Sequence, residues 1–167
     1  MKRILSFISV FALLFTACEG DPGPPGIQGP QGPAGGLIVA SAFEIVIDFT
    51  EENNYEFIEA YGFDVFPSDV TLVYILWDTL NGQDIWRLMP QTVPFEDGDL
   101  VYNFDFTIDD VRFFLDGTTD FSTLDPVWTE GQVFRVVVIP ADNVDSIDVS
   151  DINNVMQLGN IQSFDIR

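Results

Sequence analysis

Residues 70–89 read VTLVYILWDTLNGQDIWRLM, an almost unbroken apolar run on each side of an Asn81-Gly82 pair. Asn and Gly both tolerate the positive φ that the two central residues of a type I′ turn require, so this pair is a strong signal for a two-residue β-hairpin. The β-branched and aromatic residues on either side are typical of strands. The stretch therefore predicts a hairpin with its tip at Asn81-Gly82.

A two-residue loop also predicts the register of the hairpin. Leu80 would face Gln83, and Trp77 would lie directly opposite Trp86 in a non-hydrogen-bonded pair, where side chains approach most closely. One face would carry Val73, Ile75 and Leu88 beside the tryptophans, and the other Leu72, Tyr74, Leu76, Ile85 and Met89, interrupted by Arg87. Neither face is polar enough to lie against water, so we expect both to be covered.

The sequence after residue 36 shows the same kind of pattern. Alternating or β-branched runs between turn residues predict further strands at Leu37–Phe49, Tyr55–Tyr61, Leu100–Ile108, Val111–Leu115 and Gln132–Ile139. Ser150 as an N-cap and Gly159 as a stop signal predict one short helix. We therefore expect residues 37–167 to form one all-β domain, an antiparallel β-sandwich of about seven strands with a short C-terminal helix.

The first 17 residues have the layout of a secretory signal peptide. Lys2 and Arg3 precede an apolar stretch, and small residues lead to a predicted cleavage after Ala17. The segment Ile4–Ala17 is 14 residues long, shorter than the ~20 residues that a transmembrane helix needs. The residue after the cleavage point is Cys18, the only cysteine. Its placement resembles the lipobox of bacterial lipoproteins, which implies that the Cys18 thiol is lipidated and that Cys18 becomes the mature N-terminus. The alternative is a signal peptide cut nearby, with Cys18 incidental.

A Gly-Pro-rich tract follows Cys18. Residues 18–36 are therefore predicted to consist of the lipidated cysteine and a spacer. Glycine recurs at every third position, at Gly20, Gly23, Gly26, Gly29, Gly32 and Gly35. This is the collagen pattern, in which only glycine fits on the axis of three chains. Residues 20–35 therefore allow a homotrimer. The alternative is a single, stiff polyproline II spacer, about 45–50 Å long at ~3.1 Å per residue.

The predicted mature chain is strongly acidic. Without Lys2 and Arg3, its only basic residues are Arg87, Arg112, Arg135 and Arg167, against 27 Asp and Glu, so its formal charge falls from −21 to −23. Such a surface repels phosphate backbones and anionic headgroups, which disfavours nucleic-acid binding and electrostatic docking on membranes. It could attract cations or basic partners, or serve only for solubility.

The residue inventory excludes several kinds of catalytic site. The sequence has no histidine, and no lysine follows Lys2, so Ser-His-Asp triads, Cys-His pairs and lysine Schiff bases cannot form within the mature chain. A carboxylate pair could still act as acid and base in a glycosidase-like cleft. The acidic run Asp142, Asp145, Asp148 and Asp151, or the pair Asp109-Asp110, could bind Ca²⁺ through oxygen ligands. The alternative for the run is a solvated acidic loop without metal.

Three tryptophans and one arginine offer a candidate ligand platform. Trp77, Trp86 and Trp128, together with Arg87 and nearby polar residues, could stack against a sugar. The alternative is that the indoles pack in the core. No cofactor is predicted.

The chain resembles small collagen-like lipoproteins of Bacteroidota, especially of flavobacteria. The resemblance covers Ala17-Cys18-Glu19-Gly20, the Gly-Pro triplets and the stretches 86–92, 102–106, 111–117 and 133–142. Phe15 stands where the lipobox of bacterial lipoproteins usually has Leu. The resemblance brings no assigned activity. It implies a Gram-negative envelope protein on the outer membrane. The domain could face the periplasm or the cell surface.

These observations together predict a non-enzymatic, lipid-anchored envelope protein that displays a β-sandwich on a stiff spacer, in a binding or structural role. The covalent lipid would be its contact with the membrane, and its ligand would be a glycan or a protein. The alternative is a carbohydrate-binding surface lipoprotein that uses exposed tryptophan.

Overall fold

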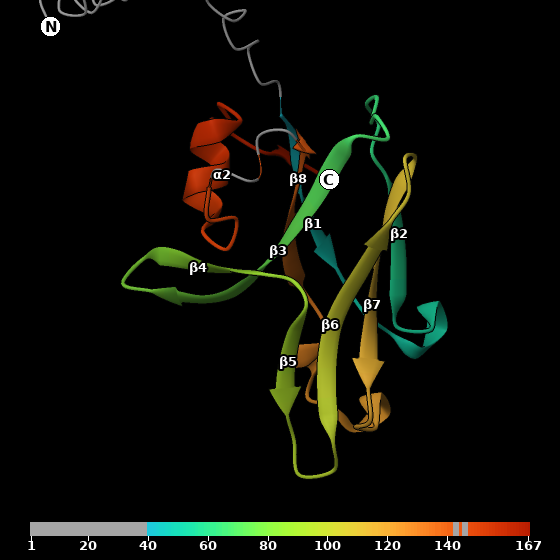
Figure 1. Ribbon diagram of the computed structural model, residues 1–167. Helices are drawn as coiled ribbons and strands as arrows, with labels where there is room; N and C mark the ends of the chain where they lie inside the picture. The colour runs from blue at the N-terminus through green and yellow to red at the C-terminus, as the bar shows by residue number, and fades with distance from the viewer. Residues whose placement is uncertain (1–39, 142–143, 145–146) are drawn as a thin grey trace, which may run out of the picture. The chain divides into compact units, whose positions relative to one another are not determined.

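The computed structural model describes residues 40–141, 144 and 147–167. Within these residues the chain forms two β-sheets and one short α-helix, so the predicted all-β sandwich with a C-terminal helix is confirmed (Figure 1). No helix in this described part is long and apolar enough to span a membrane. The predicted signal peptide, cleavage at Ala17, lipidation at Cys18 and Gly-Pro tract all lie outside the described residues.

The nine strands of the described residues form two sheets in which nearly all neighbours run antiparallel. The five-stranded sheet has the order β4-β3-β8-β1-β9 and the four-stranded sheet the order β2-β7-β6-β5. Pairing is antiparallel except that β9 runs parallel to β1. The strands are β1 Ser41–Ile47, β2 Glu56–Ala60, β3 Asp69–Leu80, β4 Gln83–Leu88, β5 Gln91–Pro94, β6 Asp99–Phe106, β7 Asp110–Gly117, β8 Gln132–Pro140 and β9 Asp165–Ile166. The helix is α2 Ile152–Leu158, and the short 3-10 helices are η2 Glu51–Asn53, η3 Phe121–Thr123 and η4 Pro126–Trp128.

The main core lies between the two sheets. Alternate residues of the facing strands are buried there, because successive side chains of a strand point to opposite faces. The fully or almost fully buried members include Phe43, Ile45, Ile47, Val73, Ile75, Leu100, Tyr102, Val111, Phe113 and Phe134. The alternation predicted for residues 100–108 holds at Leu100 and Tyr102, whereas β6 ends at Phe106, which is half exposed, and Ile108 lies in the following turn.

A second apolar cluster covers the other face of the five-stranded sheet. Leu72 and Tyr74 of β3 pack there with residues of β8 and with Ile152 and Val155 of α2. The Tyr74 hydroxyl donates a hydrogen bond to the carbonyl of Val149, just before the helix, at 2.6 Å. Strand β3 is therefore covered on both faces, as its composition requires.

The predicted register of the hairpin is right at its tip and wrong at its base. Leu80 pairs with Gln83, but a β-bulge between Leu76 and Asp78 shifts the ladder, so Leu76 and not Trp77 faces Trp86. Opposed residues of a regular ladder share one face, and a bulge removes that constraint by adding one residue to one strand. Trp77 therefore packs against the core between the sheets, while Trp86 packs against the helix-side cluster.

The helix begins one residue later than predicted. Asp151, and not Ser150, is the N-cap, because its carboxylate accepts the N–H of Asn153 at 2.9 Å. The Ser150 hydroxyl instead donates to Asp148 at 2.6 Å. The helix ends at Leu158, so the stop predicted at Gly159 is confirmed.

Two turn glycines both have positive φ but differ in the space that surrounds them. Gly82, at the hairpin tip, has φ +78° and nothing within 4 Å of the position that a Cβ would occupy. Gly117 has φ +127°, and a Cβ there would collide with the carbonyl oxygen of Asp99. That carbonyl also accepts the N–H of Thr118 at 2.9 Å. The second position therefore combines strain with a backbone clash.

We expect Gly82→Ala to lower the free energy of unfolding by about 1–2 kcal/mol, the cost of a left-handed conformation for a residue with a Cβ. Gly117→Ala should cost more than about 4 kcal/mol, because the β6 and β7 backbones must move apart. Urea unfolding of both variants measures the difference. Equal losses would contradict the described approach of Gly117 to Asp99.

Candidate functional site

A cleft of about 420 Å³ opens at the edge of the core, where β3 runs out toward the hairpin. One side is formed by β3 and the other by η4 and the start of β8. Its lining residues are Ile75, Leu76, Trp77, Asp78, Thr79, Tyr102, Val127, Trp128, Glu130, Gly131, Gln132 and Val133. Two of the three tryptophans singled out from the sequence therefore line one cavity.

Trp77 lies on the same face of β3 as Val73 and Ile75, and the bulge separates it from Trp86. The Trp77 side chain is partly buried against the core between the sheets, and the Arg87 guanidinium carbon lies 4.0 Å from the centroid of its ring. Of the arginines in the described part of the chain, Arg87 alone makes no ion pair with a described residue. Its charge is stabilised by the indole face, an arrangement that also holds the ring in place.

Trp128 is held from three directions. The Asp125 carboxylate caps η4 by accepting the N–H of Val127 at 3.1 Å. The Trp128 ring meets Phe95 edge to face, with 5.5 Å between centroids, and its carbonyl accepts the Tyr102 hydroxyl at 2.7 Å. Burial raises the pKa of the Tyr102 phenol, so this hydroxyl remains a donor well into the alkaline range. The second indole is therefore a fixed wall.

The rim of the cleft is polar and acidic. Asp78 and Glu130 are exposed on opposite sides, and no lysine or arginine is among the lining residues. The Gln132 side-chain amide donates to the carbonyls of Val127 and Glu130, both at 2.9 Å, which leaves its carbonyl oxygen as an acceptor. The site thus combines two indoles with several hydrogen-bond acceptors.

Trp86 does not belong to this site. It lies on the helix side of the five-stranded sheet, where the Arg135 guanidinium stacks 4.0 Å from its ring and 4.4 Å from that of Phe164. Arg135 also donates to the Glu44 carboxylate at 2.9 Å. The structure therefore brings Trp77, Arg87 and Trp128 to one side of the sheet and separates Trp86 from them.

The sequence did not point to Asp78, Glu130 and Gln132 as site residues. Glu130-Gly131 reads only as a turn before a strand, and Asp78 follows the apolar run without any motif. Their meeting depends on the neighbouring positions of β3 and β8 in the sheet. No local signal could have identified them.

The calcium candidates divide between described and undescribed residues. Asp142 and Asp145 lie outside the described residues. The Asp148 carboxylate accepts the hydroxyl and the N–H of Ser150, and these bonds hold its pKa below the usual value, while Asp151 caps α2. Among residues 40–141, 144 and 147–167, no three Asp, Glu, Cys or His side chains form a group suited to a metal ion. Asp148 and Asp151 thus have local structural roles.

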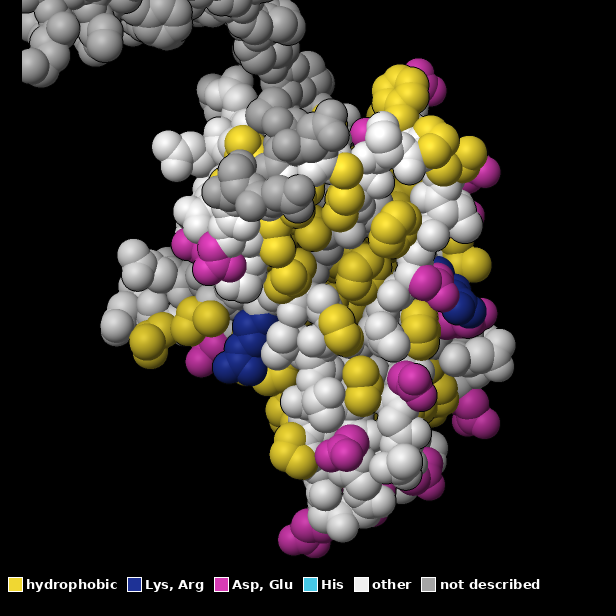
Figure 2. All heavy atoms as spheres, in the orientation of Figure 1, with side chains coloured by type: hydrophobic (Ala, Val, Ile, Leu, Met, Phe, Trp, Pro, Cys, Tyr) yellow, Lys and Arg dark blue, Asp and Glu magenta, His cyan; other side chains and the backbone are white. Residues whose placement is uncertain are grey.

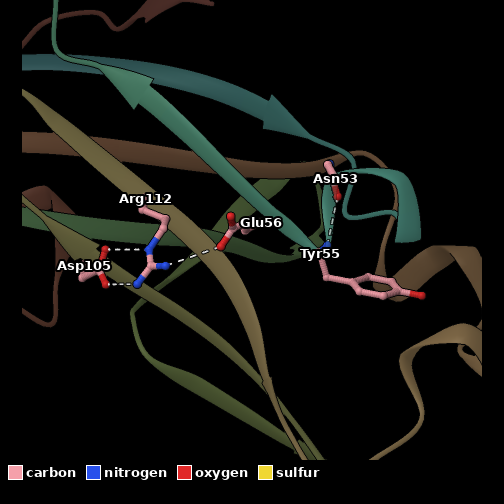
Figure 3. Close-up of polar contacts among 5 residues, drawn as sticks. All are labelled: Asn53, Tyr55, Glu56, Asp105 and Arg112. Carbon is pink, nitrogen blue, oxygen red and sulfur yellow. Dashed lines mark hydrogen bonds and ion pairs between the residues drawn. The ribbon is translucent and has the colours of Figure 1, made fainter.

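The outer face of the four-stranded sheet carries an ion-pair cluster (Figure 3). Arg112 of β7 donates through two nitrogens to the Asp105 carboxylate and through a third to Glu56, at 3.4 Å. The Arg112 side chain holds the pKa of Asp105 below its usual value. Close by, the Tyr55 N–H donates to the Asn53 side chain at 3.1 Å, which closes the turn before β2. This cluster joins three neighbouring strands.

The two ion-paired arginines Arg135 and Arg112 should differ in their effect on stability. The Arg135 side chain is 21% exposed and Arg112 is 40% exposed. We expect Arg135→Ala to lower the free energy of unfolding by roughly 2 kcal/mol, because the Glu44 charge and two aromatic faces lose their partner. Arg112→Ala should cost clearly less, since water solvates its partners. Chemical denaturation of both variants checks the order, and the reverse order would be inconsistent with the burial described.

In comparisons with protein-family models, curated proteins and solved structures, no significant match to this chain was found. The resemblance to collagen-like lipoproteins therefore remains a prediction from the sequence. What can be said of the function depends on the cleft, on Cys18 and on the repeat that follows it.

Proposed function

We propose that this protein is a lipid-anchored envelope protein that displays its β-sandwich as a binding module on a Gly-Pro spacer. The anchor is inferred from Cys18, which directly follows a charged n-region, an apolar stretch and small residues. The resemblance to lipoproteins of Bacteroidota favours the outer membrane as the location. Two or three acyl chains, at ~0.8 kcal/mol per buried methylene, would hold the protein almost irreversibly on a lipid layer.

The binding role is supported by one observation, the cleft between Trp77 and Trp128. Ligand sites combine apolar walls with a few well-placed polar groups, and this cavity has that composition. We propose binding and not catalysis because the lining offers indoles, hydroxyls, carboxylates and an amide, while the sequence has no histidine to act as a base near neutral pH.

A second candidate narrows the ligand to a glycan. Indole faces stack against the apolar faces of sugar rings, and the acceptors of Asp78, Glu130 and Gln132 could receive sugar hydroxyls. The acidic rim disfavours anionic sugars. We therefore propose a neutral oligosaccharide as the ligand of a carbohydrate-binding surface lipoprotein, with Trp77 and Trp128 as its walls.

The anchor is tested by Cys18→Ala in the full chain. Palmitate labelling should be lost, and the protein should move from the membrane fraction to the soluble envelope fraction, because its only thiol is gone. Ser6→Ala, within the apolar stretch, is the matched control and should stay acylated. A Cys18→Ala protein that remains acylated and membrane-bound would disprove the anchor.

The glycan candidate is tested by fluorescence in a Trp86→Phe background, which leaves only the two indoles of the cleft. Titration with neutral hexasaccharides of glucose and mannose should shift their emission to the blue and protect them from acrylamide. Asp78→Asn combined with Glu130→Gln should weaken binding at least about tenfold, since two charge-assisted hydrogen bonds are lost.

The control for this titration is Glu51→Gln combined with Glu52→Gln, two exposed acids in η2 that do not line the cleft. This variant should bind as the parent does. The glycan candidate fails if no hexasaccharide changes the spectrum, or if both double variants weaken binding equally. The anchor would be unaffected by either result.

A further inference from the structure

Three large hydrophobic side chains are exposed together at one end of the domain. Phe66, in the loop between β2 and β3, is 64% exposed, and Ile108, in the turn between β6 and β7, is 54% exposed. Phe106, the last residue of β6, is 47% exposed and stacks on Phe104 with 6.3 Å between ring centroids. We name Phe66, Phe106 and Ile108 the Ala40-end patch.

The described chain begins at this same end. Ser41 of β1 and Asp69 of β3 both pair with the last residues of β8. The Tyr61 N–H donates to the Asp109 carbonyl at 3.1 Å, which fixes the chain after β2 to the turn between β6 and β7. Figure 1 shows the start of β1, the loop between β2 and β3 and the turn between β6 and β7 at one end, and Figure 2 shows hydrophobic side chains over that loop and that turn.

The sequence before Ala40 suggests what covers the patch. Glycine occupies every third position from Gly20 to Gly35, as three chains wound around one axis require. Ala40 follows Gly35 by only five positions, and at 3.3–3.6 Å per residue this segment spans at most about 18 Å. If three chains wind together, each domain therefore starts close to the common axis, and the three ends that carry the Ala40-end patches lie near one another.

We propose that the chain forms a homotrimer in which the Ala40-end patches of three copies pack together at the end of the Gly-X-Y repeat. Five triplets provide few contacts between chains, so a triple helix of this length needs a second contact between the three chains to be stable. The patch supplies it, and the repeat in turn raises the effective concentration of the domains for one another. Each contact compensates for the weakness of the other.

A lipid surface fits this patch less well. The exposed side chains of Asp64 and Asp109 flank Phe66 and Ile108, and they would have to approach anionic headgroups. A stiff spacer would also keep the domain away from the bilayer. Copies of the same chain are brought together by the repeat itself, which overcomes their mutual repulsion.

That repulsion gives the trimer a characteristic salt dependence. Three chains of formal charge −23 meet at an acidic end, and raising the salt from 0.1 M to 1 M shortens the Debye length from ~10 Å to ~3 Å. Hydrophobic contacts survive this change. The trimer should therefore dissociate less as salt rises, opposite to an assembly held by ion pairs.

The test is light scattering on the mature chain carrying Cys18→Ser, which needs no detergent, at 0.1 M and 1 M NaCl. The parent should have three times the mass of one chain, with the trimer favoured at 1 M. Phe66→Ser combined with Ile108→Ser should shift the mass to that of a single chain. Gly26→Ala combined with Gly29→Ala should do the same, because the repeat is interrupted.

The matched control is Leu80→Ser combined with Ile58→Ser, which removes two similarly exposed apolar side chains, 60% and 57%, outside the patch and outside the cleft lining. It should remain trimeric. A monomeric parent at both salt concentrations overturns the proposal, as does a Phe66→Ser/Ile108→Ser variant that stays trimeric. Flotation of a monomeric parent with phosphatidylethanolamine vesicles, lost in the patch variant, would also overturn it in favour of lipid.

Discussion

Strand β3 is apolar on both faces, and the rest of the domain is arranged to cover it. Val73 and Ile75 pack against the four-stranded sheet, while Leu72 and Tyr74 pack against β8 and α2. Burying such a strand removes several large side chains from water, at roughly 25 cal/mol per Å² of apolar surface. A single sheet cannot do this, so the fold needs both the second sheet and the C-terminal helix. This also explains why a chain of formal charge −21 folds without a disulfide, since it has one cysteine.

The bulge at Trp77 connects this packing to the candidate site. Because it places Trp77 and Trp86 on opposite faces, each indole meets a different arginine, Arg87 on one side and Arg135 on the other. Arg135 is also paired with Glu44 and stacked on a second ring, so Trp86 is part of the structure. Trp77 instead stands at the margin of the core, where the cleft begins. The bulge thus separates the two indoles, and of these two only Trp77 lines the cleft.

Much of this fold could be predicted because it depends on local patterns. Alternation predicts β1 and β6, apolar and β-branched runs predict β3 and β8, and the Asn81-Gly82 pair predicts the hairpin tip. The bulge could not be predicted, since nothing in residues 76–78 marks it and only the two packed faces select it. Strand β5 is short and ends at Pro94, and β9 has two residues, so neither carries a periodic signal. Both are stabilised by their neighbours in the sheets.

The candidate site was predictable only in part. Trp77 and Trp128 could be named as candidates from the sequence because tryptophan often contributes to ligand sites. That they line the same cleft depends on how η4 lies beside β3 and β8. The Asp78 and Glu130 carboxylates come from segments about 50 residues apart that only the sheet order brings together. Because Asp is common in this sequence, an individual Asp can be identified as a site residue only from its place in the fold.

The placement of Trp77 is measured most directly by nuclear Overhauser effects from its indole protons. The structure predicts contacts from Trp77 to the Arg87 side chain and to Ile75 and other cleft-lining residues, and none to the Trp86 ring. Contacts between the Trp77 and Trp86 indoles would show a ladder without a bulge. The cleft, and the binding role inferred from it, would then have to be abandoned.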